Sequence, residues 1–464
     1  MADRTTTPSR SDVVVQAMTD QMTRLAQTLS AWVQAEARPL QAIEEQVVRV
    51  LHDLGTMLLA ALVPLAAPPR ATPDVACPCG QTARYQRLRP ATVTTLLGRL
   101  TFTRAVYHCA ACGQGSAPLD RQLQVAAGGL SLGLQELLAL LGATQDSFAQ
   151  ATAVLQRLCL VQVCPNSARA ATEDLGAQVT AHAQQVVATA EATQTLPPAD
   201  TAAPPRLYLS MDGVIAHMHD TGWKELKVGC VYTTRTRTSP QRPEQPVLRA
   251  EAQSYVVARA DADGFGWQLW AEACRRGVAL STDVVVIGDG AHWIWNLADL
   301  HFPQATQIVD WYHASQYVWR AATTIYGEGS ALRTPWAQQQ LDALWDGRVG
   351  AVMAALEPFR AKGDGVQAAL SYYTTHQARM DYPTYRARGL QIGSGTVESA
   401  CKQLVSTRLK LAGMIWDAEG AEAVAVVRAW LKSERWDEAM RLRPPPQRAY
   451  RRQAASPTTS AAAA

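Results

Sequence analysis

Three carboxylates stand where strand-like patterns end or a helical pattern begins. Asp212 ends the alternating stretch RLYLSMDG, which predicts a strand with Tyr208, Ser210 and Asp212 on one face. Asp289 follows the apolar run VVVI and lies between two glycines, which allow backbone or ligand to approach closely. Glu398 lies in the first turn of the helix predicted after GSGTV. These residues could meet at one edge of a sheet.

Converging carboxylates of this kind suit phosphoryl transfer. They could hold two divalent ions about 3.5–4 Å apart around an in-line displacement. A mixed sheet with one acid on its first strand, one on its fourth and one on a following helix is the ribonuclease H-like arrangement. Each acid also has a structural reading, because Asp212 and Asp289 could stabilise turns and Glu398 could pair with Lys402 four residues on.

Four cysteines form a second candidate site. Two pairs, Cys77 with Cys79 and Cys109 with Cys112, flank strand-like sequence and suit a tetrahedral structural zinc ion. One residue separates the first pair instead of the usual two to four, so His108 is an alternative ligand and reduced core thiols are an alternative reading. The other cysteines are expected only to pack on apolar faces: Cys159, Cys164, Cys230, Cys274 and Cys401.

The surrounding pattern predicts a multidomain α+β chain. Apolar periodicity indicates long amphipathic helices over 13–62, and two shorter helices over 147–178 could form a helix-turn-helix or part of a bundle. The predicted organisation is an N-terminal helical region (1–70), a zinc-ribbon-like module (71–125), a helical region (126–190), a linker (191–205), a ribonuclease H-like catalytic domain (206–440) with a helical stretch at about 320–390, and a disordered basic tail (441–464).

Composition sets the class and the compartment. The 464-residue chain is 48% hydrophobic and 18% charged, with a net charge of +3, which permits nucleic acid as a partner without requiring it. The N-terminus has no apolar signal region, and the apolar stretch at 57–67 is too short to span a membrane and predicts the end of a buried helix. Nine cysteines without a signal peptide favour a reducing compartment, here the cytoplasm.

Four ordered motifs carry a family resemblance. They are MDG at 211–213, IGDGAHWIWNLADLHFP at 287–303, IVDWYHASQYVW at 308–319, and IGSGTVESACKQLVSTRLKLAGMIW at 392–416. Together they resemble bacterial insertion-sequence transposases of the Kra type, DDE enzymes related in pattern to the Mutator-like transposases. The cysteine module and the N-terminal helices are similar to parts of the same family.

The resemblance implies specific roles. The catalytic triad would be Asp212, Asp289 and Glu398, with Mg²⁺ or Mn²⁺ as cofactor, and the glycines beside Asp289 would leave room for the ions and a DNA phosphate. Asp310 competes with Asp289 for the second position. We prefer Asp289, because DWYH resembles the family's separate Asp-x-x-His motif, which makes Asp310 and His313 supporting residues. The helical stretch at 320–390 would be the insertion before the glutamate.

The implied partner is double-stranded DNA, both the element ends and the target. Basic residues near Glu398 could meet phosphates or could simply form solvated helix faces: Lys402, Arg408, Lys410, Arg379, Arg386 and Arg388. Base reading is expected from the zinc module and the 147–178 helices. A homodimer or larger assembly on DNA is expected, with the helices of 13–62 as the contact, at the nucleoid of a bacterial cytoplasm and not at a membrane.

Two other functions remain open alongside a transposase. One is a structure-selective nuclease on the same fold, which would cut DNA without joining the ends to a target. The other is a sequence-specific DNA-binding protein descended from a transposase, against which three converging acids argue. Inverted repeats flanking the gene would discriminate best among these readings.

Overall fold

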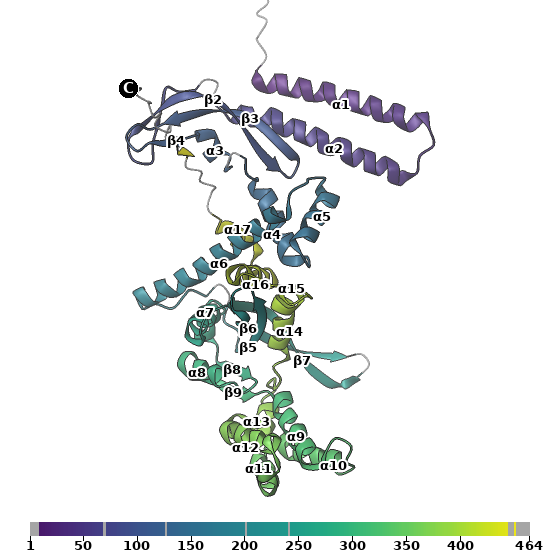
Figure 1. The fold of residues 1–464 in the computed structure, drawn as a ribbon, viewed down its shortest axis with the longest axis vertical. Helices are drawn as coiled ribbons and strands as arrows, with labels where there is room; N and C mark the ends of the chain where they lie inside the picture. Colours follow the sequence, from purple (N-terminus) through teal and green to yellow (C-terminus); the bar gives the residue numbers. More distant parts are fainter. Residues whose placement is uncertain are drawn as a thin grey trace, which may run out of the picture. The chain divides into compact units, whose positions relative to one another are not determined.

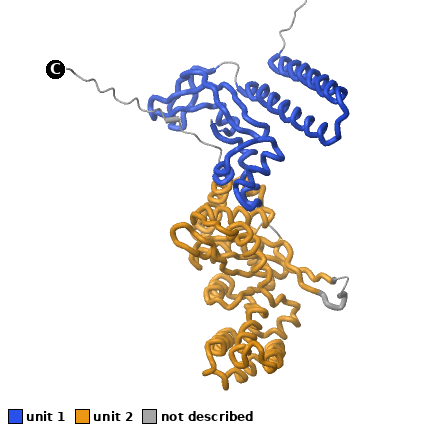
Figure 2. Tube along the Cα trace, turned by 45° about the vertical axis from the view of Figure 1, so that its right-hand side comes forward, with its two compact units in different colours: residues 1–171, 443–464 blue, residues 172–442 orange. Residues whose placement is uncertain are grey.

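The computed structural model describes residues 9–67, 71–125, 128–199, 202–239, 242–443 and 450–451. The chain divides into two compact units, which Figure 2 shows in different colours. Unit 1 comprises residues 1–171 and 443–464, and unit 2 comprises residues 172–442. Each unit has its own five-stranded sheet, so the chain is a multidomain α+β protein.

Unit 1 begins with two long helices, α1 (Arg10–Ala35) and α2 (Leu40–Leu62), which run side by side as a hairpin (Figure 1). Ser9 starts α1 with a capping box, because its side chain accepts from the backbone of Asp12 while the Asp12 carboxylate accepts from the backbone of Ser9. Among the residues that the structure describes, neither helix has a buried member. The prediction that residues 57–67 end a buried helix is therefore wrong.

The second helix continues into the short helix η1 (Val63–Ala66). The stretch Leu40–Ala66 is long and apolar enough to cross a membrane by length and composition alone, and very little of it is buried in the described structure. Apolar side chains such as Val48, Leu51 and Leu62 thus remain exposed along the helix.

The sheet of unit 1 is built on one long antiparallel hairpin. Its strand order is β1-β2-β3-β4-β10, and the strands are β1 (Asp74–Ala76), β2 (Thr82–Thr95), β3 (Gly98–His108), β4 (Gln114–Ser116) and β10 (Tyr450–Arg451). Alternate residues of β2 and β3, such as Val93 and Phe102, pack with Val63 and with Leu119 of α3 (Pro118–Gln122). The predicted hairpin of the cysteine region is present.

Three helices follow the sheet: α4 (Leu132–Thr144), α5 (Phe148–Cys159) and α6 (Pro165–Thr193). Ser131 and Ser147 cap the first two by accepting from backbone N–H groups. Leu138 and Leu155 are fully buried in the core between these helices.

The C-terminal segment returns to unit 1. Arg443 donates to the carbonyl oxygen of Leu132 at 3.2 Å and to Oε1 of Gln135 at 2.6 Å. Tyr450 pairs with Gly115 in the strand register of β10 and β4. The prediction of a disordered tail is therefore wrong for Arg443 and 450–451, and residues 444–449 and 452–464 lie outside the described part of the chain.

Unit 2 is organised by a mixed sheet with strand order β7-β6-β5-β8-β9. The strands are β5 (Arg206–Met218), β6 (Gly222–Ser239), β7 (Arg242–Ala258), β8 (Asp283–Gly288) and β9 (Thr306–Val309). Strand β6 pairs antiparallel with both β5 and β7, whereas β8 pairs in parallel with both β5 and β9. Strands β6 and β7 form the long hairpin in Figure 1 and extend through most of residues 235–246, where prolines and arginines in the sequence indicate a loop.

Helices pack on both faces of this sheet. A Cβ on Gly229 of β6 would meet Leu269 of α7 (Ala262–Arg275), so α7 covers the face to which Gly229 belongs. The opposite face carries Tyr232, next to which Thr396 of α14 (Gly395–Cys401) lies. Because Tyr208, paired with Tyr232, and Asp212 alternate along β5 on this face, α14 covers the same side of the sheet as Asp212.

The remaining helices of unit 2 complete the layers. A helical group lies between β9 and α14, as expected for the stretch at 320–390, and Figure 1 shows it gathered together. Its members are α9 (Trp311–Tyr326), α10 (Arg333–Trp345), α11 (Val349–Leu356), η3 (Glu357–Lys362), α12 (Asp364–His376), η4 (Gln377–Arg379) and α13 (Tyr382–Ala387). The others are η2 (Val278–Leu280), α8 (His292–His301), the π-helical turn η5 (Lys402–Ser406), α15 (Thr407–Leu409), α16 (Ala418–Lys432) and α17 (Trp436–Arg441).

Candidate functional site

Three aspartates lie beside the carboxyl-terminal ends of the parallel strands β8 and β9 in the sheet of unit 2. Ser210 of β5 lies opposite Ile287 of β8, and Asp212 and Asp289 each follow two residues later. The backbone N–H of Asp310, directly after β9, donates to the carbonyl oxygen of Gly288 at 2.8 Å. Asp212 lies within β5, which continues to Met218 beyond its pairing with β8, whereas Asp289 and Asp310 directly follow β8 and β9. The register therefore places the three acids at the same level of the sheet, beside the carboxyl ends of β8 and β9.

The Asp310 carboxylate is fully buried and organises the start of α9. It accepts from the backbone N–H of His313 at 2.7 Å and from the backbone N–H of Ser394. His313 Nδ1 lies 3.4 Å from Asp310 Oδ1. Burial alone would raise the pKa of Asp310, but the contacts with His313 and Ser394 outweigh it and lower that pKa. Asp310 therefore stays ionised.

His313 carries the complementary charge. The contact with Asp310 raises its pKa, burial opposes the rise, and the carboxylates of Asp289 and Glu398 add to it. His313 therefore holds its proton to higher pH than an ordinary imidazole. A cation next to several carboxylates reduces their mutual repulsion at this edge of the sheet.

Glu398 reaches the same place from the first turn of α14. Its side chain is half exposed, Ser394 Oγ donates to its Oε1 at 3.3 Å, and His313 Nδ1 lies 4.0 Å from that oxygen. Ligating atoms of Asp310, His313 and Glu398 all lie within 4.8 Å of one another, close enough to hold a metal ion. Among the ion pairs of the described residues, none joins Glu398 to Lys402, so the structural alternative for Glu398 has no support.

Asp212 and Asp289 form the other half of the cluster. Burial raises the pKa of Asp212, and the Asp289 carboxylate raises it further, so the two acids lie within electrostatic range. The thiol of Cys401 donates to Asp212 Oδ2 at 3.7 Å, and burial followed by the Asp212 charge raises the pKa of that thiol. Cys401 was expected only to pack, and this expectation is wrong.

The glycines beside Asp289 serve the protein itself. Gly290 has φ +112°, and a Cβ there would lie 2.6 Å from Cε2 of Tyr372. A Cβ on Gly288 would lie 2.8 Å from Cγ2 of Ile294. The sequence-based interpretation that both glycines make room for ions and phosphate is corrected, because their close neighbours are side chains of α8 and α12.

A hollow of about 350 Å³ opens beside Asp289, and we call it the Asp289 hollow. Its lining comes from the loop after β8, from α9 and from α12: Asp289, Gly290, Ala291, His313, Gln316, Tyr317, Arg320 and Tyr372. Tyr317, Arg320 and Tyr372 were not among the site residues predicted from the sequence. The spacing of His313, Tyr317 and Arg320 along one helix face could have indicated the first two, whereas Tyr372 comes from a helix far along the chain.

The predicted phosphate-contacting residues separate into two groups. Lys402 and Lys410 are exposed on the segment after Glu398. Arg408 is 1% exposed, with its guanidinium 4.9 Å from the Trp416 ring, so its prediction as a DNA contact is wrong. Arg388 pairs with Asp283 at 2.9 Å at the start of β8, about 20 Å along the strand from Asp289 by the rise per residue, and its role as a DNA contact stays a prediction.

Two further arginines have structural partners instead of free charge. Arg386 donates to the carbonyl oxygen of Trp345 at 2.8 Å and lies 3.9 Å over its ring. Arg379 donates to Gln307 at 2.6 Å and lies 4.7 Å over Trp295. The Arg379 contacts join the helical group of 311–387 to β9 and α8, and the Arg386 contacts lie within that group. Sequence spacing could not reveal either set.

The four predicted cysteines of unit 1 converge. Sγ atoms of Cys77 and Cys112 lie 3.6 Å apart, and those of Cys79 and Cys109 lie 3.7 Å apart. All four sulfurs lie within 4.8 Å of one another and could hold a zinc ion. His108 is not in this group, since it pairs with Arg84 and Gly115 in the strand ladder, so the short spacing of the first pair needs no substitute ligand.

The local backbone favours the thiolate form of one of these cysteines, Cys109, whereas the pKa values of Cys77 and Cys112 are raised. The N–H of Gly80 donates to the carbonyl oxygen of Cys77, and that of Gly113 donates to the carbonyl oxygen of Cys109, so each cysteine pair surrounds a tight turn. Backbone N–H groups, first that of Cys112, lower the pKa of Cys109 to about 7 despite its burial. A thiolate is therefore accessible near neutral pH, as zinc binding requires.

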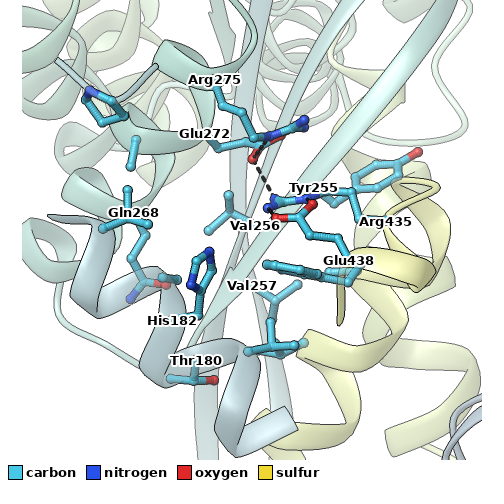
Figure 3. Close-up of a pocket in the computed structure, with 18 of the residues that line it drawn as sticks. Thr180, His182, Tyr255, Val256, Val257, Gln268, Glu272, Arg275, Arg435 and Glu438 are labelled. Carbon is cyan, nitrogen blue, oxygen red and sulfur yellow. Dashed lines mark hydrogen bonds and ion pairs between the residues drawn. The ribbon is translucent and has the colours of Figure 1, made fainter. Parts of the chain in front are cut away.

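A second cavity in unit 2, of about 260 Å³, lies apart from the acids (Figure 3). Apolar residues such as Val257 and Trp430 form most of its wall. Glu272, Arg275, Arg435 and Glu438 form ion pairs with one another on its lining, including the 2.9 Å contact of Arg435 with Glu272 drawn in Figure 3. Its charged groups are thus already paired, and we assign this cavity no chemistry.

The fold and the acid cluster define a multidomain α+β protein with a carboxylate-rich site at the tips of parallel strands. The chain belongs to the uncharacterised protein family UPF0236, whose family model matches residues 36–334. This range includes the cysteine module, Asp212, Asp289, Asp310 and His313, and it ends before Glu398. No curated protein matches the chain.

Proposed function

We propose that this chain is a DNA transposase that cleaves and transfers strands at the ends of an insertion sequence, with Asp212, Asp289 and Glu398 as its catalytic triad. The observation that carries the proposal is the placement of these acids on neighbouring elements beside the carboxyl ends of β8 and β9. Two arrive by the register of parallel strands, and the third arrives on the helix that covers the same face. Two-metal phosphoryl transfer needs carboxylates from separate elements in such an arrangement.

The sheet supports the same proposal. Its order, with three antiparallel strands followed by two strands parallel to the first, agrees with the order expected of a ribonuclease H-like domain. The acids lie on the first strand, directly after the fourth and on a later helix. The helical group between Asp310 and Glu398 corresponds to the insertion that the resemblance implies. The four ordered motifs that resemble transposases fall on these same elements.

The residues fit divalent metal ions, Mg²⁺ or Mn²⁺. Asp212 is partly buried against a second carboxylate that raises its pKa, a situation that a bound cation relieves. Asp212 and Asp289 would hold the ions, with Glu398 as a further ligand. Bound ions would activate the attacking oxygen and stabilise the leaving one. Asp310 fixes the start of α9, and protonated His313, with Ser394, positions Glu398.

The DNA would contact exposed basic groups near this cluster. Lys402 and Lys410 remain the candidates from the predicted set, since both are exposed on the segment after Glu398. The zinc-ribbon-like module and helix α5 of unit 1, and helix α6, which runs from unit 1 into unit 2, would recognise the element ends. The protein would act at the nucleoid of a bacterial cytoplasm, as a dimer or larger assembly on DNA.

Replacing Glu398 with glutamine tests the triad. Glu398→Gln keeps the side-chain shape but removes one charge, so magnesium-dependent cleavage of a plasmid carrying the gene with its native flanking DNA should fall by about 10²-fold or more. Gel-shift binding of that flanking DNA should be unchanged. The matched control is Glu357→Gln, which removes an exposed carboxylate paired with Arg360 in the helical group.

The outcomes separate the alternatives. Cleavage and joining by Glu398→Gln at the wild-type rate would refute the triad, and loss of end binding would assign Glu398 a structural role. Wild-type protein that cuts DNA but never joins the ends to a target would be a nuclease. Wild-type protein that binds flanking DNA without metal-dependent cutting would be a DNA-binding protein.

A further inference from the structure

One face of α9 lines the Asp289 hollow with an imidazole, an amide, a phenol ring and a guanidinium group. His313, Gln316, Tyr317 and Arg320 follow one another along α9 at three- and four-residue spacing, so their side chains project to the same side. His313 belongs to the carboxylate cluster, whereas the next three extend the lined surface away from it. The hollow is therefore continuous with the proposed catalytic site but larger than metal ions require.

One wall of the hollow is a fixed aromatic pair. The rings of Tyr317 and Tyr372 are stacked, with centroids 3.9 Å apart and an interplanar angle of 17°. The hydroxyl of Tyr372 donates to the carbonyl oxygen of Asp289 at 2.7 Å. Since Gly290 has no Cβ, the Tyr372 ring can lie directly against the loop that carries Asp289. The pair is thus held in place before any ligand arrives.

Arg320 supplies a charge without an internal partner. Its side chain is exposed, and within the described ranges no carboxylate forms an ion pair with it. Two other arginines of the same helical group are paired, Arg348 with Asp346 at 3.0 Å and Arg360 with Glu357 at 2.7 Å. A free guanidinium beside a set of carboxylates that it does not neutralise suits an external anion.

We propose that the Asp289 hollow binds an unpaired nucleotide at the end of the DNA, next to the phosphate that is cut. The base would lie against the Tyr317–Tyr372 pair, because aromatic side chains stack on bases of unpaired strands. Arg320 would contact the phosphate of that nucleotide, and Gln316 would meet a polar edge. This inference rests on the proposed function and names the part of the substrate that the site selects: a single-stranded end.

A fluorescent base tests this assignment directly. The probe is a duplex oligonucleotide with a short single-stranded 3′ extension ending in 2-aminopurine, mixed with full-length protein and calcium in place of magnesium. Stacking should quench the probe with wild type and with Tyr317→Phe, which keeps the ring, but not with Tyr317→Ala. Loss of one stacked base should weaken the Kd for this probe by about tenfold and leave the Kd for a blunt duplex unchanged.

The arginine has its own signature. Arg320→Gln should reduce the salt dependence of log Kd for the extended probe by about 0.7, as expected for one lost phosphate contact on a single strand. Matched controls are Tyr312→Ala, an exposed tyrosine on the same helix outside the hollow, and Arg360→Gln. Both controls should bind and quench like wild type.

Two results keep this inference apart from the proposed function. If wild type cleaves DNA through Glu398 while Tyr317→Ala quenches and binds the extended probe normally, the nucleotide assignment is overturned and the transposase proposal stands. If wild type quenches the probe through Tyr317 but never cleaves DNA with Mg²⁺ or Mn²⁺, the proposed function fails and the binding assignment holds.

Discussion

The charge on His313 allows several carboxylates to share one edge of the sheet. Burial against each other would make these acids hold protons, as the raised pKa of Asp212 shows. Asp310 resists this tendency, because His313 and the backbone of Ser394 stabilise its ionised form. The cluster therefore holds an ion pair between Asp310 and His313 beside the carboxylates of Asp212 and Asp289, which a bound cation would stabilise.

A second histidine, His376, behaves in the opposite way and gives a prediction. Burial, then the charges of Arg379 and His292, lower its pKa from 6.5 to about 4. In the unfolded chain His376 is protonated as the pH falls through about 6.5, whereas in the folded chain it is protonated only near pH 4. The free energy of unfolding should therefore fall as pH drops through this window, by on the order of 3 kcal/mol for this group.

Denaturant unfolding of wild type and His376→Gln at several pH values measures the effect. The variant should lose part of the slope between about pH 6.5 and pH 4, whereas His219→Gln, which changes an exposed histidine, should keep it. An identical slope in wild type and His376→Gln would show that His376 does not titrate in this way.

Residue types predicted the acids and the cysteines but not their neighbours. Asp212, Asp289 and Glu398 were recognisable because each ends or begins a periodic segment. The contacts of Cys401 with Asp212 and of Tyr372 with Asp289 join segments far apart in the chain, so no local pattern announces them. Arg408 was wrongly predicted to contact DNA, because its burial against the Trp416 ring depends on packing that the local pattern does not show.

At the scale of elements, each site depends on a turn or register that a local pattern can specify. The mixed sheet of unit 2 was predictable in its alternating strands, and its edge positions follow from parallel pairing. The extent of β6 and β7 was not predictable from the sequence. The prolines and arginines of 235–246 indicate a loop, whereas β6 extends to Ser239 and β7 begins at Arg242. The four cysteines that could bind zinc were predictable from the sequence. That His108 lies outside this group was not.

The cysteine module should require zinc. Purified protein is expected to contain about one zinc ion per chain, and Cys109→Ser should lose it with a cost on the order of several kcal/mol in folding of the β1–β4 sheet. Metal analysis and thermal unfolding with a chelator measure both effects. Cys164→Ser, which changes an exposed cysteine of unit 1 outside the cluster, is the control. Full stability of metal-free protein would contradict the assignment.

At the scale of the whole molecule, the helices α1 and α2 stand out because the described chain buries none of their residues. A two-helix hairpin has little stability in water unless its apolar stripe is covered. Val48, Leu51, Leu58 and Leu62 lie on exposed surface of α2, with exposed fractions of 40% or more. A second copy of the same hairpin could cover this stripe as a four-helix bundle.

Disrupting this stripe should change the size of the assembly. Leu51→Glu is expected to convert dimers to monomers in sedimentation, because a charge would enter the apolar contact, whereas Gln41→Glu adds the same charge at a polar position and should have no effect. Unchanged sedimentation of Leu51→Glu would exclude the contact. Binding of wild type to lipid vesicles, lost in Leu51→Glu with no change in oligomer size, would instead assign the helix to a membrane.

The return of the chain to unit 1 affects the order in which the protein can be completed during synthesis. Strand β10 and Arg443 belong to unit 1, yet they are made after all of unit 2. While the ribosome is still adding these residues, strand β4 has an open edge on which β10 has yet to pair. The sheet of unit 1 can therefore be completed only after the synthesis of about 270 further residues, residues 172–442 of unit 2. A fusion placed at the C-terminus would act on the last strand of the first-made sheet.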